Sequence, residues 1–281
     1  MSAVRDVIIG GMVLPLSERV CVMGVLNVTP DSFSDGGKFF GPDKAVERAL
    51  ELAGQGADII DIGGESSRPG ARSVAAEEEL ERVIPVIKAL KGRIGVPISV
   101  DTCKAEVARQ AVREGASIIN DITALRGDPA MAEVAASSGA HVVLMHMLGT
   151  PGDMQDKPVY GDVVEDIFAF FVDAIEKASR AGIDPEKIIV DPGIGFGKTL
   201  EHNLKILKGL KRFRDLGRPL LAGTSRKSFI GALTGKEAGD RVLGTAASVA
   251  VAVINGADIV RVHDVGMMRD VVSVSDAVRR I

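Results

Sequence analysis

The sequence predicts an α/β protein, a (β/α)8 TIM barrel that forms a single domain over residues 1–281. One phrase recurs along the chain: Gly-Ala, then a short run of apolar and β-branched residues, then a polar residue. The phrases are GADIIDIG, GASIINDI, GAHVVLMH and GADIVRVH, which begin at Gly56, Gly115, Gly139 and Gly256. Each follows a stretch with helical spacing, so its glycine fits the left-handed position just after a helix. The apolar run fits a parallel strand that is buried on both faces.

Eight strands of this kind can be counted, and a candidate helix follows each one, as in a barrel of βα units. They lie at residues 20–26, 57–62, 97–100, 117–120, 140–145, 187–190, 219–222 and 258–261. An open, doubly wound sheet is the alternative that this pattern leaves open. The first residues, VIIGGMVL, predict a short β-hairpin with Gly10 and Gly11 at its turn, which would close the bottom of a barrel.

The composition restricts the class of protein. Hydrophobic residues make up 46% of the chain, which is enough for a large core. The net charge is −4, tryptophan is absent and there is one tyrosine, so a nucleic-acid partner is not expected. No apolar run reaches about 18 residues and no leader opens the chain, which predicts a cytoplasmic protein with no membrane partner. Cys21 and Cys103 are expected to be free, buried thiols.

Polar side chains stand where the predicted strands end. In a barrel of this type the active site lies at the carboxyl ends of the strands. The residues there are Asn27, Asp61, Asp101, Asn120, His146, Asp191, the run TSRKS at 224–228, and Arg261 with His263. Because Asp and Asn also cap helices, Asp61 and Asp101 have a purely structural alternative. His141 and His146 have one too, as buried core or loop histidines.

The residue types at these positions predict two parts of a ligand. One of Arg226 and Lys227 would point inward, and with Arg261 and His263 it suits an anionic group, most simply a phosphate or diphosphate. Carboxylates and amides at the same mouth suit a ring with adjacent N–H donors. The glycine-rich loops at 61–71 and 191–199 match neither a P-loop nor a dinucleotide fingerprint. The polar loop LNVTPDSFSDGG, at 26–37, leaves a buried strand and is expected to close over the ligand.

Seven segments, in this order, closely resemble the dihydropteroate synthase family of folate biosynthesis. They are LNVTPDSFSDGG, GGESSRPGA, SVDT, IINDI, DPGIGFGKT, GTSRKSFIG and RVHD. The resemblance implies a transferase that joins p-aminobenzoate to hydroxymethyl-dihydropterin diphosphate and releases diphosphate and dihydropteroate. Such enzymes are sulfonamide targets. Ser67 stands where many members of the family carry threonine, and its hydroxyl group preserves the chemistry.

The resemblance also implies the residues of the site. The pterin ring would be held by Asp101, Asn120, Met145, Asp191, Lys227 and Arg261. The diphosphate would be bound by Asn27, Arg68, Arg261 and His263. The aminobenzoate pocket would be formed by Ser67, Arg68, Pro69, Phe196, Lys227 and Ser228. Mg²⁺ would be ligated by Asn27 and, in the closed state, by Asp35. The residues expected to act in catalysis are Asp101, Lys227, Arg68 and Asp35, and a homodimer is implied.

In the implied mechanism, the C–O bond to the diphosphate breaks first and leaves a pterin-methyl cation, which Asp101 and Asp191 stabilise. The loop at 26–37 would then exclude water from the cation. Two other functions remain open at this point. A pterin-dependent methyltransferase would share the barrel but lack the loops at 26–37 and 61–71. A pterin-binding protein without turnover would have lost residues of the catalytic set.

Overall fold

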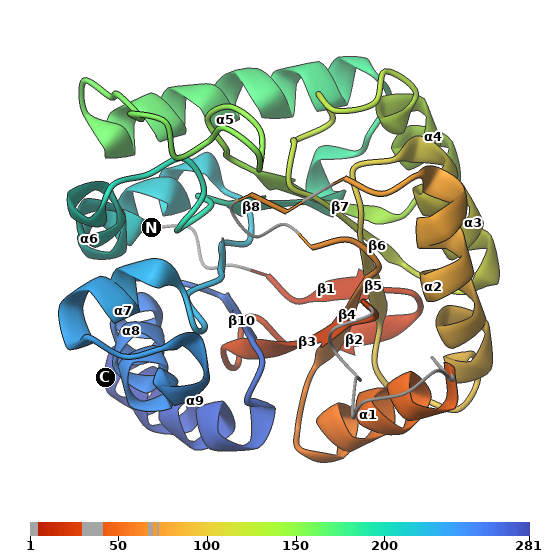
Figure 1. The fold of residues 1–281 in the computed structure, drawn as a ribbon, viewed down its shortest axis with the longest axis horizontal. Helices are drawn as coiled ribbons and strands as arrows, with labels where there is room; N and C mark the ends of the chain where they lie inside the picture. The colour runs from red at the N-terminus through yellow and green to blue at the C-terminus, as the bar shows by residue number, and fades with distance from the viewer. Residues whose placement is uncertain (1–4, 30–41, 67–69, 72) are drawn as a thin grey trace.

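The computed structural model describes residues 5–29, 42–66, 70–71 and 73–281, and it confirms the barrel (Figure 1). Eight parallel strands follow one another in the order β8-β7-β6-β5-β4-β3-β10-β9. A parallel bridge between Val190 and Leu220 joins the two outer strands and nearly closes the sheet. The strands are β3 Cys21–Asn27, β4 Ile59–Gly63, β5 Ile98–Asp101, β6 Ile118–Asp121, β7 His141–Met145, β8 Ile188–Asp191, β9 Leu221–Ala222 and β10 Ile259–Val262. They lie within two residues of the predicted ranges.

Helices surround the strands, as the view along the barrel shows (Figure 1). In the described part of the chain they are α1 Pro42–Gly54, α2 Ala76–Leu90, α3 Ala105–Glu114, α4 Met131–Ser138, α5 Val163–Arg180, α6 Leu200–Gly209, α7 Ser228–Thr234, α8 Val242–Ile254 and α9 Val265–Arg279. Short 3-10 turns, Pro185–Lys187, Leu210–Leu216 and Ala238–Asp240, join some of them. None of the helices described is both long enough and apolar enough to cross a membrane.

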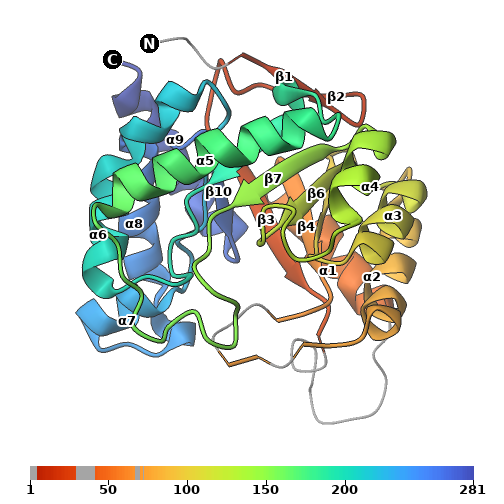
Figure 2. The ribbon, with the colours of Figure 1, turned by 90° about the horizontal axis from the view of Figure 1, so that it is seen from above.

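The predicted hairpin closes one end of the barrel (Figure 2). Strands β1 Val7–Ile9 and β2 Met12–Leu14 pair in antiparallel fashion around Gly10 and Gly11. Both glycines have positive φ values, 58° and 80°, as a tight two-residue turn requires. Ile9 and Leu14 are buried against the apolar residues that open the strands, including Cys21 and Ile59. The polar end of the barrel is therefore the opposite one, where the strands finish.

Alternation along the strands produces this polarity. On β4, Ile59 belongs to the apolar layer above the hairpin, and Asp61 lies two residues further along the same face. On β10 the same step leads from Ile259 to Arg261. Ile60 and Val260, which point the other way, pack against the helices. β4 and β10 thus each contribute an apolar residue to the core and a charged residue to the mouth.

An aspartate in each of two repeated Gly-Ala-Asp phrases ties the bottom of the barrel together. Asp58 accepts hydrogen bonds from the Val22 amide at 2.8 Å and from the guanidinium groups of Arg19 and Arg269 at 2.9 Å. Asp258 repeats the pattern with the Leu220 amide, Arg214 and Arg279. These carboxylates pair strand edges with the surrounding helices, so the repeat has a structural purpose.

We expect Asp58→Ala to lower the free energy of unfolding by about 3 kcal/mol, because two partly buried arginines and one strand amide lose their acceptor. Denaturant unfolding followed by circular dichroism measures the change. Glu201→Ala serves as the control, because it breaks only the exposed pair with Lys205 and should leave the midpoint where it is. Equal effects in the two variants would show that the Asp58 network contributes nothing to stability.

Candidate functional site

Four polar side chains from four strands form one hydrogen-bonded cluster at the mouth. The Asp61 Oδ2 atom accepts from Asn120 Nδ2 at 3.0 Å and from Arg261 Nε at 2.6 Å. The Arg261 Nη2 atom donates to Asp101 Oδ2 at 2.6 Å. One guanidinium therefore lies between two carboxylates, at the end of the barrel where the strand-end pattern predicts that polar side chains converge. A side-chain fork of this shape is well suited to bridge two acids.

Asp61, like Asp101, is a residue of this cluster for which the sequence left a structural alternative open, and the family resemblance gave Asp61 no role. Its side chain is fully buried and caps no helix; instead it holds Asn120 and Arg261. Because the Asn120 amide nitrogen donates to Asp61, its oxygen is left to accept from a ligand. The Asp61 Oδ1 atom has no partner among the described residues. Its position at a strand end was the only signal in the sequence.

Burial sets the electrostatics of the mouth. Burial raises the pKa of Asp101, and the nearby Arg261 charge only partly offsets this. Burial likewise raises the pKa of Asp191, although its Oδ1 atom accepts from the Gly193 amide at 2.7 Å. Burial alone would lower the pKa of Arg261, but the carboxylates of Asp61 and Asp101 outweigh it and raise that pKa. Asp101 and Asp191 therefore have too few hydrogen-bond donors to offset the cost of burying their ionised forms.

Lys227 enters the mouth from a strained turn that follows β9. Arg226 has a φ of +58°, and this left-handed backbone is held by a hydrogen bond from its amide to Thr245 Oγ1 at 3.0 Å. The Arg226 guanidinium pairs outward with Asp264, with its Nη2 atom 2.6 Å from Oδ1. Lys227 instead lies with Nζ 3.8 Å from the centre of the Phe196 ring. Burial lowers the pKa of Lys227 to about 8.

An apolar wall stands beside Lys227. Met145, at the end of β7, is buried in a small cluster with Met147, Met154 and Phe196. Ser228 is the first residue of α7 and is exposed. The structure therefore brings together Met145, Phe196 and Lys227, which the resemblance placed on the pterin and aminobenzoate sides of the site.

Asn27 and His263 end neighbouring strands on the other side of the mouth. Asn27 is the last residue of β3 and is partly exposed, and it stands opposite Gly63 of β4. The His263 Nδ1 atom lies 3.0 Å from Ser225 Oγ, and burial lowers the pKa of His263 to about 3. The other residues that the resemblance implies lie outside the described residues: Asp35, Ser67, Arg68 and Pro69.

The histidines that had a structural alternative are indeed buried. His141 begins β7, and burial lowers its pKa to about 4. His146 follows the same strand and contacts Lys198 rather than the mouth cluster. Cys21 and Cys103 are free thiols; Cys21 is buried, as expected, and Cys103 is only partly buried.

The oxygen atoms at the mouth suit a magnesium ion that is shared with a substrate. Among the described residues there is no group of three or more histidines, cysteines, aspartates and glutamates that could hold a metal alone. Mg²⁺ in proteins keeps several waters and takes one or two protein oxygens together with substrate phosphates. The amide oxygen of Asn27, at the end of β3, is a suitable ligand for such an ion.

Comparison with known proteins identifies the family. The model for pterin binding enzymes matches residues 23–263. The dihydropteroate synthase of Synechocystis is 47% identical over 273 residues, which cover 97% of this chain and 94% of that protein. The Escherichia coli K12 dihydropteroate synthase is 50% identical over 244 residues, which cover 87% of this chain and 86% of that protein.

Solved structures agree. A Yersinia pestis dihydropteroate synthase in a sulfonamide drug complex superposes with a TM-score of 0.92 at 45% identity, covering 98% of this chain and 99% of that one. A Xanthomonas albilineans dihydropteroate synthase in complex with 7,8-dihydropteroate superposes with a TM-score of 0.88 at 44% identity, with the same coverage. The family match, the barrel and the cluster at its mouth lead to one conclusion: this chain belongs to the dihydropteroate synthases, within the family of pterin binding enzymes.

Proposed function

We propose that this protein condenses p-aminobenzoate with hydroxymethyl-dihydropterin diphosphate to form dihydropteroate and diphosphate. The observation that carries the proposal is the buried cluster of Asp61, Asp101, Asn120 and Arg261 at the barrel mouth. It offers acceptors to a flat ring that is rich in N–H donors, beside a cation for an anionic tail. The close relatives named as dihydropteroate synthases support the same assignment.

The pterin ring would occupy the space bounded by the cluster. Asp101, Asp191 and the free oxygen of Asn120 accept hydrogen bonds from its N–H groups, and Lys227 donates to its carbonyl oxygen. The Arg261 guanidinium stacks on the ring face, and Met145 packs against the ring.

The diphosphate would lie on the side of Asn27 and His263. Arg261 and Arg68 add positive charge there, which balances the leaving group. Asn27 and Asp35 would hold a Mg²⁺ ion, which would help to neutralise the charge of the phosphate oxygens. His263 is neutral without ligand, and a neighbouring diphosphate would raise its pKa and favour its charged, donating form.

The reaction follows from this arrangement. The C–O bond breaks, and its electron pair leaves with the diphosphate. The remaining pterin-methyl cation is stabilised by the negative charges of Asp101 and Asp191. The aminobenzoate nitrogen then forms the new C–N bond and loses a proton. Since the cation is the electrophile, no side-chain nucleophile is required.

The aminobenzoate would lie between Phe196 and the loop that carries Ser67, Arg68 and Pro69, with Lys227 and Ser228 at its carboxylate end. The same pocket would accept sulfonamides, and a Yersinia pestis relative has been solved as a sulfonamide drug complex.

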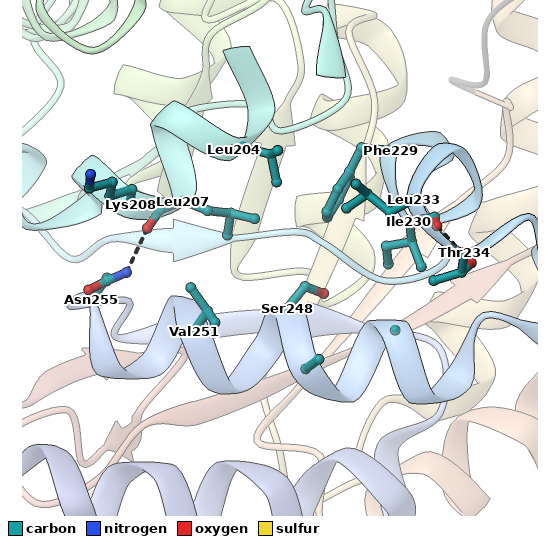
Figure 3. Close-up of a pocket in the computed structure, with 12 residues that line it drawn as sticks. Leu204, Leu207, Lys208, Phe229, Ile230, Leu233, Thr234, Ser248, Val251 and Asn255 are labelled. Carbon is teal, nitrogen blue, oxygen red and sulfur yellow. Dashed lines mark hydrogen bonds between the residues drawn. The ribbon is translucent and has the colours of Figure 1, made fainter. Parts of the chain in front are cut away.

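We also propose that the protein is a cytoplasmic homodimer. The free thiols Cys21 and Cys103 fit a reducing compartment. A cavity of about 400 Å³ opens between α6, α7 and α8, and its lining is almost entirely apolar (Figure 3). Leu233 and Leu243, 57% and 72% exposed, extend this apolar surface along α7 and α8. A second copy of the chain would bury it.

We expect release of diphosphate from the pterin diphosphate to require Mg²⁺ and to yield dihydropteroate when p-aminobenzoate is present. Coupled phosphate detection and chromatography of the product measure the two events. Release without aminobenzoate would support formation of the cation before attack. Binding of the pterin diphosphate without release would favour a non-catalytic pterin binder. Methyl transfer from a reduced folate to a corrinoid would favour the methyltransferase.

We expect Asp101→Asn to lower kcat about 100- to 1000-fold, because a neutral amide cannot offset the charge of the cation. The fold should persist. Because burial raises the pKa of Asp101, the folded state binds more protons than the unfolded state between the two pKa values, so the acid opposes folding more strongly as the pH rises through that range. The variant should therefore be at least as stable as the parent protein at pH 8. A variant with near-parental kcat would contradict this catalytic role.

We expect Leu233→Glu combined with Leu243→Glu to convert the dimer to monomers, because two charges would be buried in an apolar interface. Sedimentation velocity at micromolar protein concentration gives the mass. Ile8→Glu, which changes an equally exposed apolar residue on the hairpin, is the control and should leave the dimer intact. A parent protein that sediments as a monomer would refute the proposed assembly.

A further inference from the structure

Lys198 is a buried cation for which the mechanism above has no use. Only 3% of the residue is exposed. Its Nζ atom lies 2.8 Å from the Phe196 carbonyl oxygen, 3.2 Å from the His146 carbonyl oxygen and 3.1 Å from His146 Nδ1. An ammonium group has three N–H donors, and these three acceptors use all of them. Among the described residues no carboxylate forms a direct ion pair with Lys198, although the charge of Asp191 partly offsets the effect of burial on its pKa.

These contacts determine the state of His146. When Lys198 is charged, it donates to Nδ1, and the ring is then neutral and carries its proton on Nε2. Burial and the nearby charge of Lys198 lower the pKa of His146 to about 2, which agrees with this tautomer. Burial also lowers the pKa of Lys198, to about 7. Burying a lysine that has no direct ion pair costs free energy. This cost suggests that Lys198 has a purpose other than packing.

The backbone that Lys198 fastens is the arch formed by residues 193–198, which follows β8. Gly193 and Gly197 have φ values of 66° and 61°. A Cβ atom on Gly193 would lie 2.0 Å from the His146 carbonyl oxygen, and one on Gly197 would lie 2.6 Å from that of Leu148. The arch thus rests directly on the backbone that leaves β7, and only glycine permits this approach.

Other side chains hold the two ends of the arch. The Asn203 Oδ1 atom accepts from the Gly195 amide at 2.7 Å, and the Tyr160 hydroxyl donates to the Gly197 carbonyl at 2.8 Å. The Phe196 carbonyl at the centre is held by Lys198. The ring of the same residue faces Lys227. Lys198 thus holds the backbone carbonyl of the residue whose ring faces Lys227.

We propose that Lys198 is a positioning residue for the aminobenzoate side of the site: its ammonium ties the arch to the end of β7 and so holds the Phe196 ring in place. The proposal rests on the proposed function, in which Phe196 lines the aminobenzoate pocket. Lys198 does not touch substrate. The backbone carbonyl of Asp191 accepts from the His146 amide and its Oδ1 atom from the Gly193 amide, so the position of Asp191 does not depend on a hydrogen bond to Lys198, although the charge of Lys198 helps to lower the pKa of Asp191.

The test separates the two sides of the site. Lys198→Met leaves two buried carbonyl oxygens without donors, and the arch should shift. We expect KM for aminobenzoate to rise about tenfold, while Kd for the pterin diphosphate, measured by calorimetry, stays within about twofold. Lys205→Met, on the exposed face of α6, is the matched control and should change neither constant. Lys198→Arg keeps donors and charge and should recover most of the aminobenzoate KM.

A double-mutant cycle with Phe196→Ala tests the route of the effect. If Lys198 acts through Phe196, Lys198→Met should add little to the aminobenzoate KM once the ring is gone. Fully multiplicative effects in the cycle would overturn the proposal, as would a Lys198→Met variant that loses thermal stability but keeps its aminobenzoate KM. If the methionine variant does not fold, Lys198→Gln, which keeps an amide donor, enters the same cycle.

Failure of the proposed function is distinguishable from failure of this inference. A parent protein that makes no dihydropteroate refutes the function. In that case calorimetric binding of aminobenzoate to the protein with pterin and diphosphate present replaces KM. Unchanged aminobenzoate binding in Lys198→Met, beside a parent protein that does make dihydropteroate, refutes only the role of Lys198.

Discussion

The mouth of the barrel is organised by one interaction, the pairing of the Arg261 guanidinium with the carboxylates of Asp61 and Asp101. A charge can be buried only if partners replace the water that it loses. Here one cation compensates two acids, while the carboxylate of the third acid, Asp191, accepts from one backbone amide among the described residues. The cluster is stable enough to keep its shape and still has unsatisfied acceptors. That combination allows it to be rigid and to bind a donor-rich ring.

Barrel closure makes this pairing possible. Arg261 is 200 residues from Asp61 and 160 residues from Asp101 along the chain. In the sheet β10 neighbours β3, and β3 neighbours β4, so closure brings the last strand beside the first ones. The hairpin fills the opposite end with apolar side chains, so polar groups can converge only at the carboxyl ends of the strands. Fold and site are therefore two consequences of the same alternation along each strand.

The sequence alone was sufficient for the strands and the residues that end them, because both depend on short, local patterns. It could not determine what those residues contact. Asp61 could have been a helix cap, and only the closed sheet shows that it orients Asn120 and Arg261. Lys198 stands near the end of a glycine-rich loop in the sequence, yet it is buried against the backbone of His146, which follows β7 and lies 52 residues away. The left-handed backbone of Arg226 could not be predicted from the local sequence, because it is held by a hydrogen bond to Thr245 on α8, which is distant along the chain.

The electrostatics of the free protein also explain why a dissociative reaction suits this site. Burial raises the pKa of both Asp101 and Asp191, which means that their ionised forms are poorly solvated before substrate arrives. A neutral pterin ring would stabilise the ionised carboxylates by donating hydrogen bonds to them. A pterin-methyl cation would stabilise them further, because its positive charge develops beside carboxylates from which water is largely excluded. The interaction is thus stronger in the transition state than in the ground state, which is the condition for catalysis rather than mere binding. On this argument, the cost of burying these acids in the folded protein is part of the proposed mechanism.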